Sequence, residues 1–118
     1  MRLPIQYALY YPDRMYLNDD RLDFAKIGSI TFEAPDFNVF KGLSLAYEAG
    51  RKGGSMPTAL NAANEKAVAL FLDRKIDFLS IWDIIEYCMK DHNFIEYPDL
   101  NDILQTEQEV YEMIESRW

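Results

Sequence analysis

A histidine and a cysteine are the first side chains that could do chemistry in this sequence. His92 stands in the order Lys90-Asp91-His92-Asn93, and no serine or cysteine nucleophile lies at a recognisable spacing from it. A cation near the carboxyl end of a helix is favourable, which explains His92 without catalysis. Cys88 falls on an apolar helical face, where a thiol behaves as a small hydrophobic group. We therefore expect structural roles, and a small acidic enzyme using His92 is the least favoured hypothesis.

The richest polar cluster is formed by Asn61, Asn64 and Glu65, within the order Ala-Leu-Asn-Ala-Ala-Asn-Glu. The two amides are three residues apart and share a helical face with the apolar stripe. Buried amides must be hydrogen-bonded, which favours contacts with backbone groups of neighbouring segments. A ligand contact is the alternative interpretation. We predict a structural polar cluster at these three positions and no catalytic residue.

Composition excludes several classes of protein. The 118 residues carry 12 Lys and Arg against 20 Asp and Glu, a formal charge of −8, which opposes binding to nucleic acid or an anionic membrane. One cysteine and one histidine cannot build a structural zinc site, and the acidic residues near the end show no metal-ligand spacing. No apolar run spans a bilayer and the start lacks a secretory signal. We expect a cytoplasmic protein that binds neither nucleic acid nor membrane.

The elements that position these residues are mainly helical. Amphipathic stripes at three- and four-residue steps predict helices over residues 40–50, 55–72, 80–89 and 106–114. Gly53-Gly54 ends the first of these. Ser80 with Asp83 resembles a capping box, and Thr106 with Glu109 fits one for the last helix, after a short turn that begins at Pro98. These stripes predict a four-helix-bundle-like domain over 37–118.

The first 36 residues are different. Proline positions predict a short helix over residues 4–11, and Leu22–Phe32 has the β-branched and aromatic content of a strand. A lone strand cannot satisfy its ladder hydrogen bonds, so it requires a partner chain, a neighbouring domain or the helical domain itself. The predicted fold is mainly α, with a strand-bearing amino-terminal arm over 1–36 followed by the helical domain.

Several collinear blocks resemble the carboxyl-terminal third of 1-deoxy-D-xylulose 5-phosphate reductoisomerases. The resemblance rests on Met1-Arg2-Leu3-Pro4-Ile5, Ile30-Thr31-Phe32-Glu33-Ala34-Pro35-Asp36, Leu43-Ser44-Leu45-Ala46-Tyr47-Glu48-Ala49, Leu60-Asn61-Ala62-Ala63-Asn64-Glu65 and Ile76-Asp77-Phe78-Leu79-Ser80-Ile81. The Leu-Asn-Ala-Ala-Asn-Glu element is the most specific, and the match covers essentially the whole chain.

The resemblance implies part of an NADPH-dependent bacterial oxidoreductase that also needs Mg²⁺ or Mn²⁺. Such enzymes convert 1-deoxy-D-xylulose 5-phosphate to 2-C-methyl-D-erythritol 4-phosphate in non-mevalonate isoprenoid biosynthesis. The family's nucleotide-binding domain, metal ligands and phosphate site lie upstream of the matched segment. Only Met1 corresponds to a family residue near the nicotinamide ring. The isolated chain is therefore expected to be inactive and to hold no cofactor itself.

The family layout also implies partners. The chain would join the catalytic and NADPH-binding domains of the same enzyme, which forms a homodimer, and residues 1–36 would run across the molecule and find a sheet there. Asn61, Asn64 and Glu65 would then be hydrogen-bonding residues between domains or helices. The alternative, from another class, is a stand-alone helical interaction module that pairs through its exposed strand.

Overall fold

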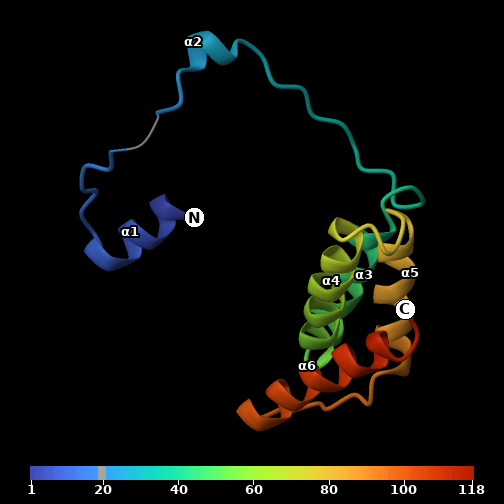
Figure 1. The fold of residues 1–118 in the computed structure, drawn as a ribbon. Coiled ribbons are helices and arrows are strands. Elements are labelled where there is room, and N and C mark those ends of the chain that lie inside the picture. Colours follow the sequence, from blue (N-terminus) through green and yellow to red (C-terminus); the bar gives the residue numbers. More distant parts are fainter. Residues whose placement is uncertain (19–20) are drawn as a thin grey trace. The chain divides into compact units, whose positions relative to one another are not determined.

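The structure is a computed structural model that describes residues 1–18 and 21–118 (Figure 1). Within this described part of the chain it contains helices and no strand, so the prediction of a mainly helical fold is confirmed. The chain divides into two compact units, Met1–Ala34 and Pro35–Trp118. Each unit is described by itself below.

The second unit is built from α3 (Lys41–Lys52), α4 (Met56–Leu72), α5 (Ser80–Asp91) and α6 (Leu100–Glu115). The longest of them, α4, packs against each of the other three. In Figure 1, α6 runs obliquely to α4 at one end of the unit. The four amphipathic stripes of the sequence therefore bury their apolar faces against one another, with α4 in the middle.

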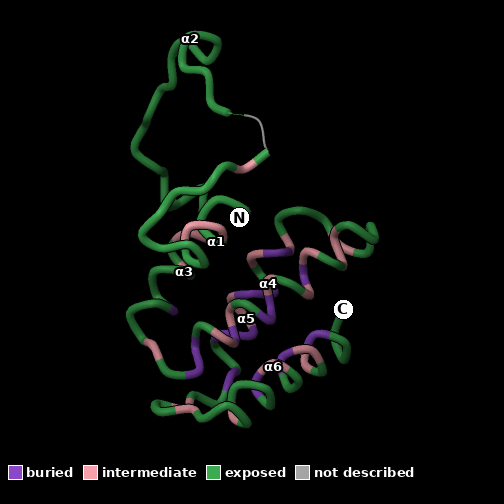
Figure 2. Tube along the Cα trace, turned by 90° about the vertical axis from the view of Figure 1, so that its left-hand side faces the viewer, coloured by how far each residue is buried: buried purple, intermediate pink, exposed green. Residues whose placement is uncertain are grey.

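The core of the second unit combines small residues of α4 with larger ones from its neighbours. Ala59, Ala63 and Ala67 are fully buried, and these short side chains let α5 and α6 approach closely. Ile84 and Ile114 fill the space between the helices and are also fully buried. Burying a side chain of this size contributes about 1.5–3 kcal/mol. Figure 2 shows the buried residues along these helices.

The two predicted capping boxes are wrong, although α5 does begin at Ser80. Ser80 is the first residue inside α5 rather than its cap, and the carboxylate of Asp77 accepts hydrogen bonds from both the backbone N–H and the hydroxyl of Ser80, each at 2.8 Å. The segment after Pro98 is not a separate turn, because one continuous helix begins at Leu100. Asp99 and Asp102 form its capping box, each carboxylate accepting from the other residue's N–H at 2.9 Å. Thr106 is buried in mid-helix.

A tight turn of two glycines joins α3 to α4. Gly53 and Gly54 have φ angles of +65° and +53°, in the left-handed region that favours glycine. A Cβ atom at Gly54 would lie 2.3 Å from the backbone oxygen of Ile95, whereas a Cβ at Gly53 would meet nothing within 4 Å. The turn therefore requires a left-handed backbone at both positions and the absence of a side chain at Gly54.

The first unit contains α1 (Arg2–Tyr10) and α2 (Phe24–Ile27). The short helix predicted over 4–11 is present, whereas the strand predicted over Leu22–Phe32 is not shown, because residues 24–27 of the described chain are helical. Asp23 caps α2, its carboxylate accepting from the N–H groups of Ala25 and Lys26 at 3.1 and 3.3 Å. A strand needs a neighbour to form its ladder, and no strand occurs among the residues that the structure describes. The local cap therefore determines the conformation at this point.

Beyond α2, residues 28–34 form neither helix nor strand and expose their apolar side chains. Phe32 is 90% exposed and Ile30 is 64% exposed. Figure 2 shows this stretch as exposed throughout. Large apolar side chains left in water gain nothing from the hydrophobic effect, so this part of the chain lacks a packing surface within its own unit.

Candidate functional site

The predicted polar cluster on α4 is divided between two faces of the helix. Asn61 is exposed and donates from its amide to the Glu65 carboxylate, one helical turn further along, at 3.3 Å. Asn64 lies on another face and contributes its amide to an apolar groove. The two asparagines therefore do not act on a common partner, although the sequence suggested a shared face.

Glu65 also takes part in a hydrogen-bond network with side chains of α6. The Tyr111 hydroxyl donates to Glu107 at 3.0 Å and has the Glu65 carboxylate as a second acceptor at 3.4 Å. Partial burial of the hydroxyl, followed by the hydrogen bond and charge of Glu107, raises the pKa of Tyr111 to about 12. Nearby, Lys66 forms an ion pair with Glu115. These contacts join α4 to α6 along a solvent-exposed edge and keep Tyr111 as a neutral hydrogen-bond donor.

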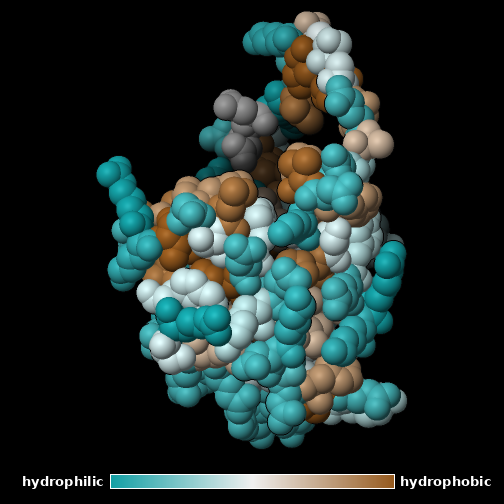
Figure 3. Space-filling model, turned by 90° about the vertical axis from the view of Figure 1, so that its right-hand side faces the viewer, coloured by the Kyte–Doolittle hydropathy of each residue, from teal (hydrophilic) through white to brown (hydrophobic). Residues whose placement is uncertain are grey.

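The groove at Asn64 has a volume of about 640 Å³ and lies within the second unit. Its lining is apolar apart from the Asn64 amide, and it consists of Val39, Phe40, Gly42, Leu43, Ala46, Leu60, Asn64, Phe78, Leu79, Trp82 and Ile85. Leu79 is 70% exposed, and the Phe78 ring stacks edge-on against Trp82 at 6.0 Å between centroids. Apolar areas that open on the surface can be seen in brown in Figure 3. Such a groove accepts an apolar group and offers it one amide.

Ser55 and His92 form a buried pair that spacing in the sequence did not reveal. The Ser55 Oγ and His92 Nε2 atoms are 2.6 Å apart, although the residues are 37 positions apart in the sequence. The backbone N–H of Ile95 donates to Ser55 Oγ at 2.9 Å, and the N–H of Ser55 donates to the Ile95 oxygen at 2.9 Å. We call these three hydrogen bonds the Ser55 clamp. Ser55 is completely buried, so its hydroxyl is not exposed to an external substrate.

The interpretation of Cys88 as a core residue is confirmed. Its side chain is completely buried in α5 and makes no disulfide. Burial, with a smaller contribution from the charge of Asp91, raises the pKa of the Cys88 thiol to about 11. The thiolate is the reactive form, so the Cys88 thiol is unreactive at neutral pH.

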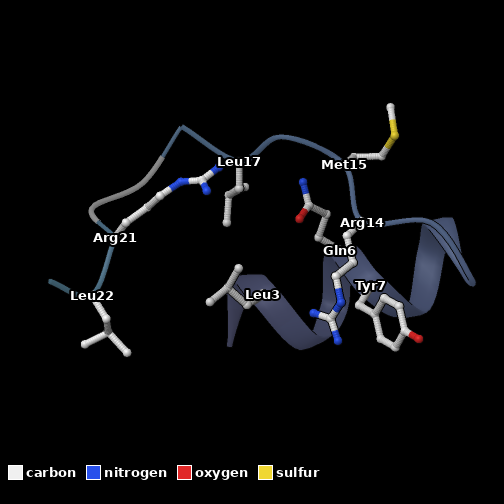
Figure 4. Close-up of a pocket in the computed structure, with 8 residues that line it drawn as sticks. All are labelled: Leu3, Gln6, Tyr7, Arg14, Met15, Leu17, Arg21 and Leu22. Atoms are coloured by element: carbon white, nitrogen blue, oxygen red, sulfur yellow. The ribbon is translucent and has the colours of Figure 1, made fainter. Parts of the chain in front are cut away.

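The first unit has a separate pocket of about 290 Å³, lined by Leu3, Gln6, Tyr7, Arg14, Met15, Leu17, Arg21 and Leu22. Figure 4 shows the Arg14 side chain extending toward α1, and its guanidinium lies 4.5 Å from the centre of the Tyr7 ring. Gln6 donates to the backbone oxygen of Tyr16 at 3.1 Å. Met1, the residue expected near a cofactor, is 92% exposed and is not among the lining residues.

In the described residues, acidic, histidine and cysteine side chains do not converge on a metal site. Among the residues that the structure describes, no group of three or more His, Cys, Asp or Glu side chains could hold a metal ion. The donor set of this part of the chain therefore does not fit a catalytic Mg²⁺ or Mn²⁺, which needs several oxygen ligands. In the same described part, no helix is long and apolar enough to cross a membrane.

Comparison with protein families matches residues 1–113 to the model described as "DXP reductoisomerase C-terminal domain". The chain belongs to this family. The 1-deoxy-D-xylulose 5-phosphate reductoisomerase of Lachnospira eligens is 63% identical over 118 residues, and the one of Agathobacter rectalis is 60% identical. Each alignment covers 100% of this chain and 31% of the relative. The chain thus spans about a third of the length of these relatives, and the family resemblance in the sequence is confirmed.

Solved structures of reductoisomerases have the same fold over this region. The enzyme from Zymomonas mobilis in complex with NADPH gives a TM-score of 0.81 at 41% identity, covering 98% of this chain and 30% of that one. A reductoisomerase in complex with NADPH, fosmidomycin and magnesium gives 0.81 at 35% identity, covering 97% and 30%. These matches include both units of the chain, and they do not support the alternative of a stand-alone interaction module.

Proposed function

We propose that the chain acts as the carboxyl-terminal part of a 1-deoxy-D-xylulose 5-phosphate reductoisomerase. The whole enzyme would convert 1-deoxy-D-xylulose 5-phosphate to 2-C-methyl-D-erythritol 4-phosphate, using NADPH and Mg²⁺ or Mn²⁺, in the cytoplasm. The observation that carries this proposal is the match over residues 1–113, with 100% of the chain aligned to 31% of a relative. The isolated chain would be inactive, because its described residues bring together no group of side chains that could hold the metal, and the family's nucleotide-binding domain lies upstream of the matched segment.

In this proposal each of the two predicted domains has its own role. Residues 37–118 are a self-contained helical support, because their core is filled from within the unit. Residues 1–36 are a linker arm whose exposed apolar side chains, such as Phe32, would pack on the catalytic domain. The strand expected over Leu22–Phe32 would form only in that setting, where it and the adjoining residues up to 36 would gain backbone partners from a sheet. Met1 would then approach the nicotinamide.

Contacts between domains would use the α4 surface. The groove next to Asn64 combines apolar walls with one amide, which is suited to a buried contact with another domain of the same polypeptide. Asn61 and Glu65 would hold α4 to α6 through Tyr111 and keep that surface rigid. We also propose that the complete enzyme is a homodimer, as its family layout implies.

A chimera tests the proposal. The matched 31% of the Lachnospira eligens enzyme would be replaced by this chain, which is 63% identical to it. We expect the chimera to oxidise NADPH in the presence of 1-deoxy-D-xylulose 5-phosphate and Mg²⁺. The same enzyme without its carboxyl-terminal third, and this chain alone, serve as controls that should show no oxidation. A folded chimera without activity, or turnover by the isolated chain, would contradict the proposal.

A further inference from the structure

The Ser55 clamp ties two turns of the second unit together. Ser55 is the last residue of the turn between α3 and α4, and His92 and Ile95 belong to the segment between α5 and α6. Gly54 lets the two backbones approach, since any Cβ there would meet the Ile95 oxygen at 2.3 Å. The clamp is therefore a buried polar contact that joins these two connections.

The hydrogen atoms of the clamp can be assigned from its partners. Ser55 Oγ accepts from the N–H of Ile95, so the hydroxyl hydrogen of Ser55 is free to be donated to Nε2 of His92. In this assignment His92 is a neutral imidazole that carries its proton on Nδ1, whereas an Nε2–H would donate to Ser55 Oγ and leave the Ser55 hydroxyl hydrogen without an acceptor in the clamp. Among the described residues, no buried side-chain nitrogen or oxygen atom lacks a partner. The neutral form of His92 therefore completes the clamp.

The surroundings of His92 determine how readily it takes up a second proton. Burial lowers the pKa of His92, the charge of Glu109 on α6 raises it, and the charge of Lys52 at the end of α3 lowers it. On α5, the backbone carbonyl of Cys88 accepts a hydrogen bond from the N–H of His92, and the Cys88 thiol is uncharged because its pKa is raised. The carboxylate of Asp91, the residue before His92, is exposed. Burial is the largest of these effects, so the pKa of His92 lies below its ordinary value.

We propose that the Ser55 clamp is an acid-sensitive latch within the helical unit. A proton added to Nε2 of His92 removes the acceptor of the Ser55 hydroxyl and leaves a charged ring in the core. The Ser55 side chain then loses the contact with His92 that holds Oγ in place for the N–H of Ile95, and the hydrogen bonds between Ser55 and Ile95 open more readily. The proposal concerns the unit itself and holds whether or not the chain serves in a reductoisomerase.

The sign of the effect follows from proton linkage. In the open latch His92 returns toward its ordinary pKa near 6.5 and binds a proton more readily than in the closed latch, where its pKa is lower. Opening is therefore favoured as the pH falls below about 6.5, and the stabilisation is fully present above that pH. The protection factor of the Ile95 amide should fall by up to about tenfold per pH unit, until the pH reaches the pKa of the closed form.

Hydrogen exchange followed by NMR on the 118-residue chain tests the latch. Between pH 7.5 and 5, we expect the Ile95 amide to lose protection while the amide of Val110, in the buried part of α6, keeps its own. The His92→Gln variant retains an acceptor for Ser55 but cannot titrate, so its Ile95 protection should not change with pH. Equal loss at Ile95 in this variant, or parallel loss at Val110, would overturn the proposal.

The imidazole signal provides a second measurement that needs no variant. The sequence contains one histidine, so its nitrogen resonances are unambiguous. We expect the Nδ1–H tautomer at pH 7.5 and a titration midpoint below 6.5. In Ser55→Ala we expect a smaller preference for the Nδ1–H tautomer and a midpoint closer to 6.5. An Nε2–H tautomer, or a midpoint at or above 6.5 in the unaltered chain, would overturn the latch.

Discussion

Replacing Gly54 by alanine tests whether the close approach at the Ser55 clamp stabilises the helical unit. The new Cβ would lie 2.3 Å from the Ile95 oxygen and the φ angle of +53° would be retained. A left-handed conformation costs a non-glycine residue about 1–2 kcal/mol. Moving Ile95 away would also break the hydrogen bonds of its N–H to Ser55 Oγ and of its oxygen to the Ser55 N–H, at about 1 kcal/mol each. We expect Gly54→Ala to lower the free energy of unfolding by about 3–4 kcal/mol.

Gly53→Ala is the matched control for this prediction. Its φ angle of +65° with ψ at −147° is also a conformation that non-glycine residues rarely adopt, but its Cβ would have open space around it. We therefore expect a smaller loss for this variant, about 1–3 kcal/mol from the backbone conformation alone. Urea unfolding of the 118-residue chain, followed by circular dichroism, measures both. If the two variants lost the same stability, the backbone strain alone would explain the effect and the clamp would contribute nothing.

Three further predictions concern single positions in the second unit. Gly50 lies inside α3 with open space around it, so Gly50→Ala should raise the free energy of unfolding by about 0.5–1 kcal/mol in the same urea experiment. Asp99→Ala should lower it by about 1 kcal/mol because the α6 capping box is lost, whereas an unchanged midpoint would refute that role. Cys88 should react with a thiol reagent at pH 8 only after denaturant is added, because it is buried and its pKa is raised to about 11; rapid labelling in buffer would contradict this.

The helices could be predicted because each carries its own periodic stripe. Ile81, Ile84 and Cys88 recur at three- and four-residue steps, and the structure buries all three in α5. The capping residues at the helix starts were harder to predict, because several side chains can accept hydrogen bonds from the same N–H groups. Asp77 supplies the side-chain acceptor at the start of α5, and the buried Thr106 extends the stripe of α6 backwards through what the sequence suggested was a boundary.

The arm and the polar pairs depend on contacts that a sequence does not state. The composition of Leu22–Phe32 is that of a strand, but a strand forms only against a neighbour, and Asp23 caps a helical turn there instead. Ser55 and His92 are 37 residues apart, so no local spacing predicts their hydrogen bond. The one available signal was the Gly-Gly-Ser order before α4, which implies a close backbone approach without saying to what.

Hydrogen exchange in residues 28–36 tests the central claim most directly, namely that this arm takes its backbone partners from the rest of a reductoisomerase. The amides would be followed in the isolated 118-residue chain and in the chimera with the Lachnospira eligens enzyme. The account predicts little protection in the isolated chain and strong protection in the chimera, while amides of α4 are protected in both. Strong protection of residues 28–36 in the isolated chain, or none in an active chimera, would contradict it.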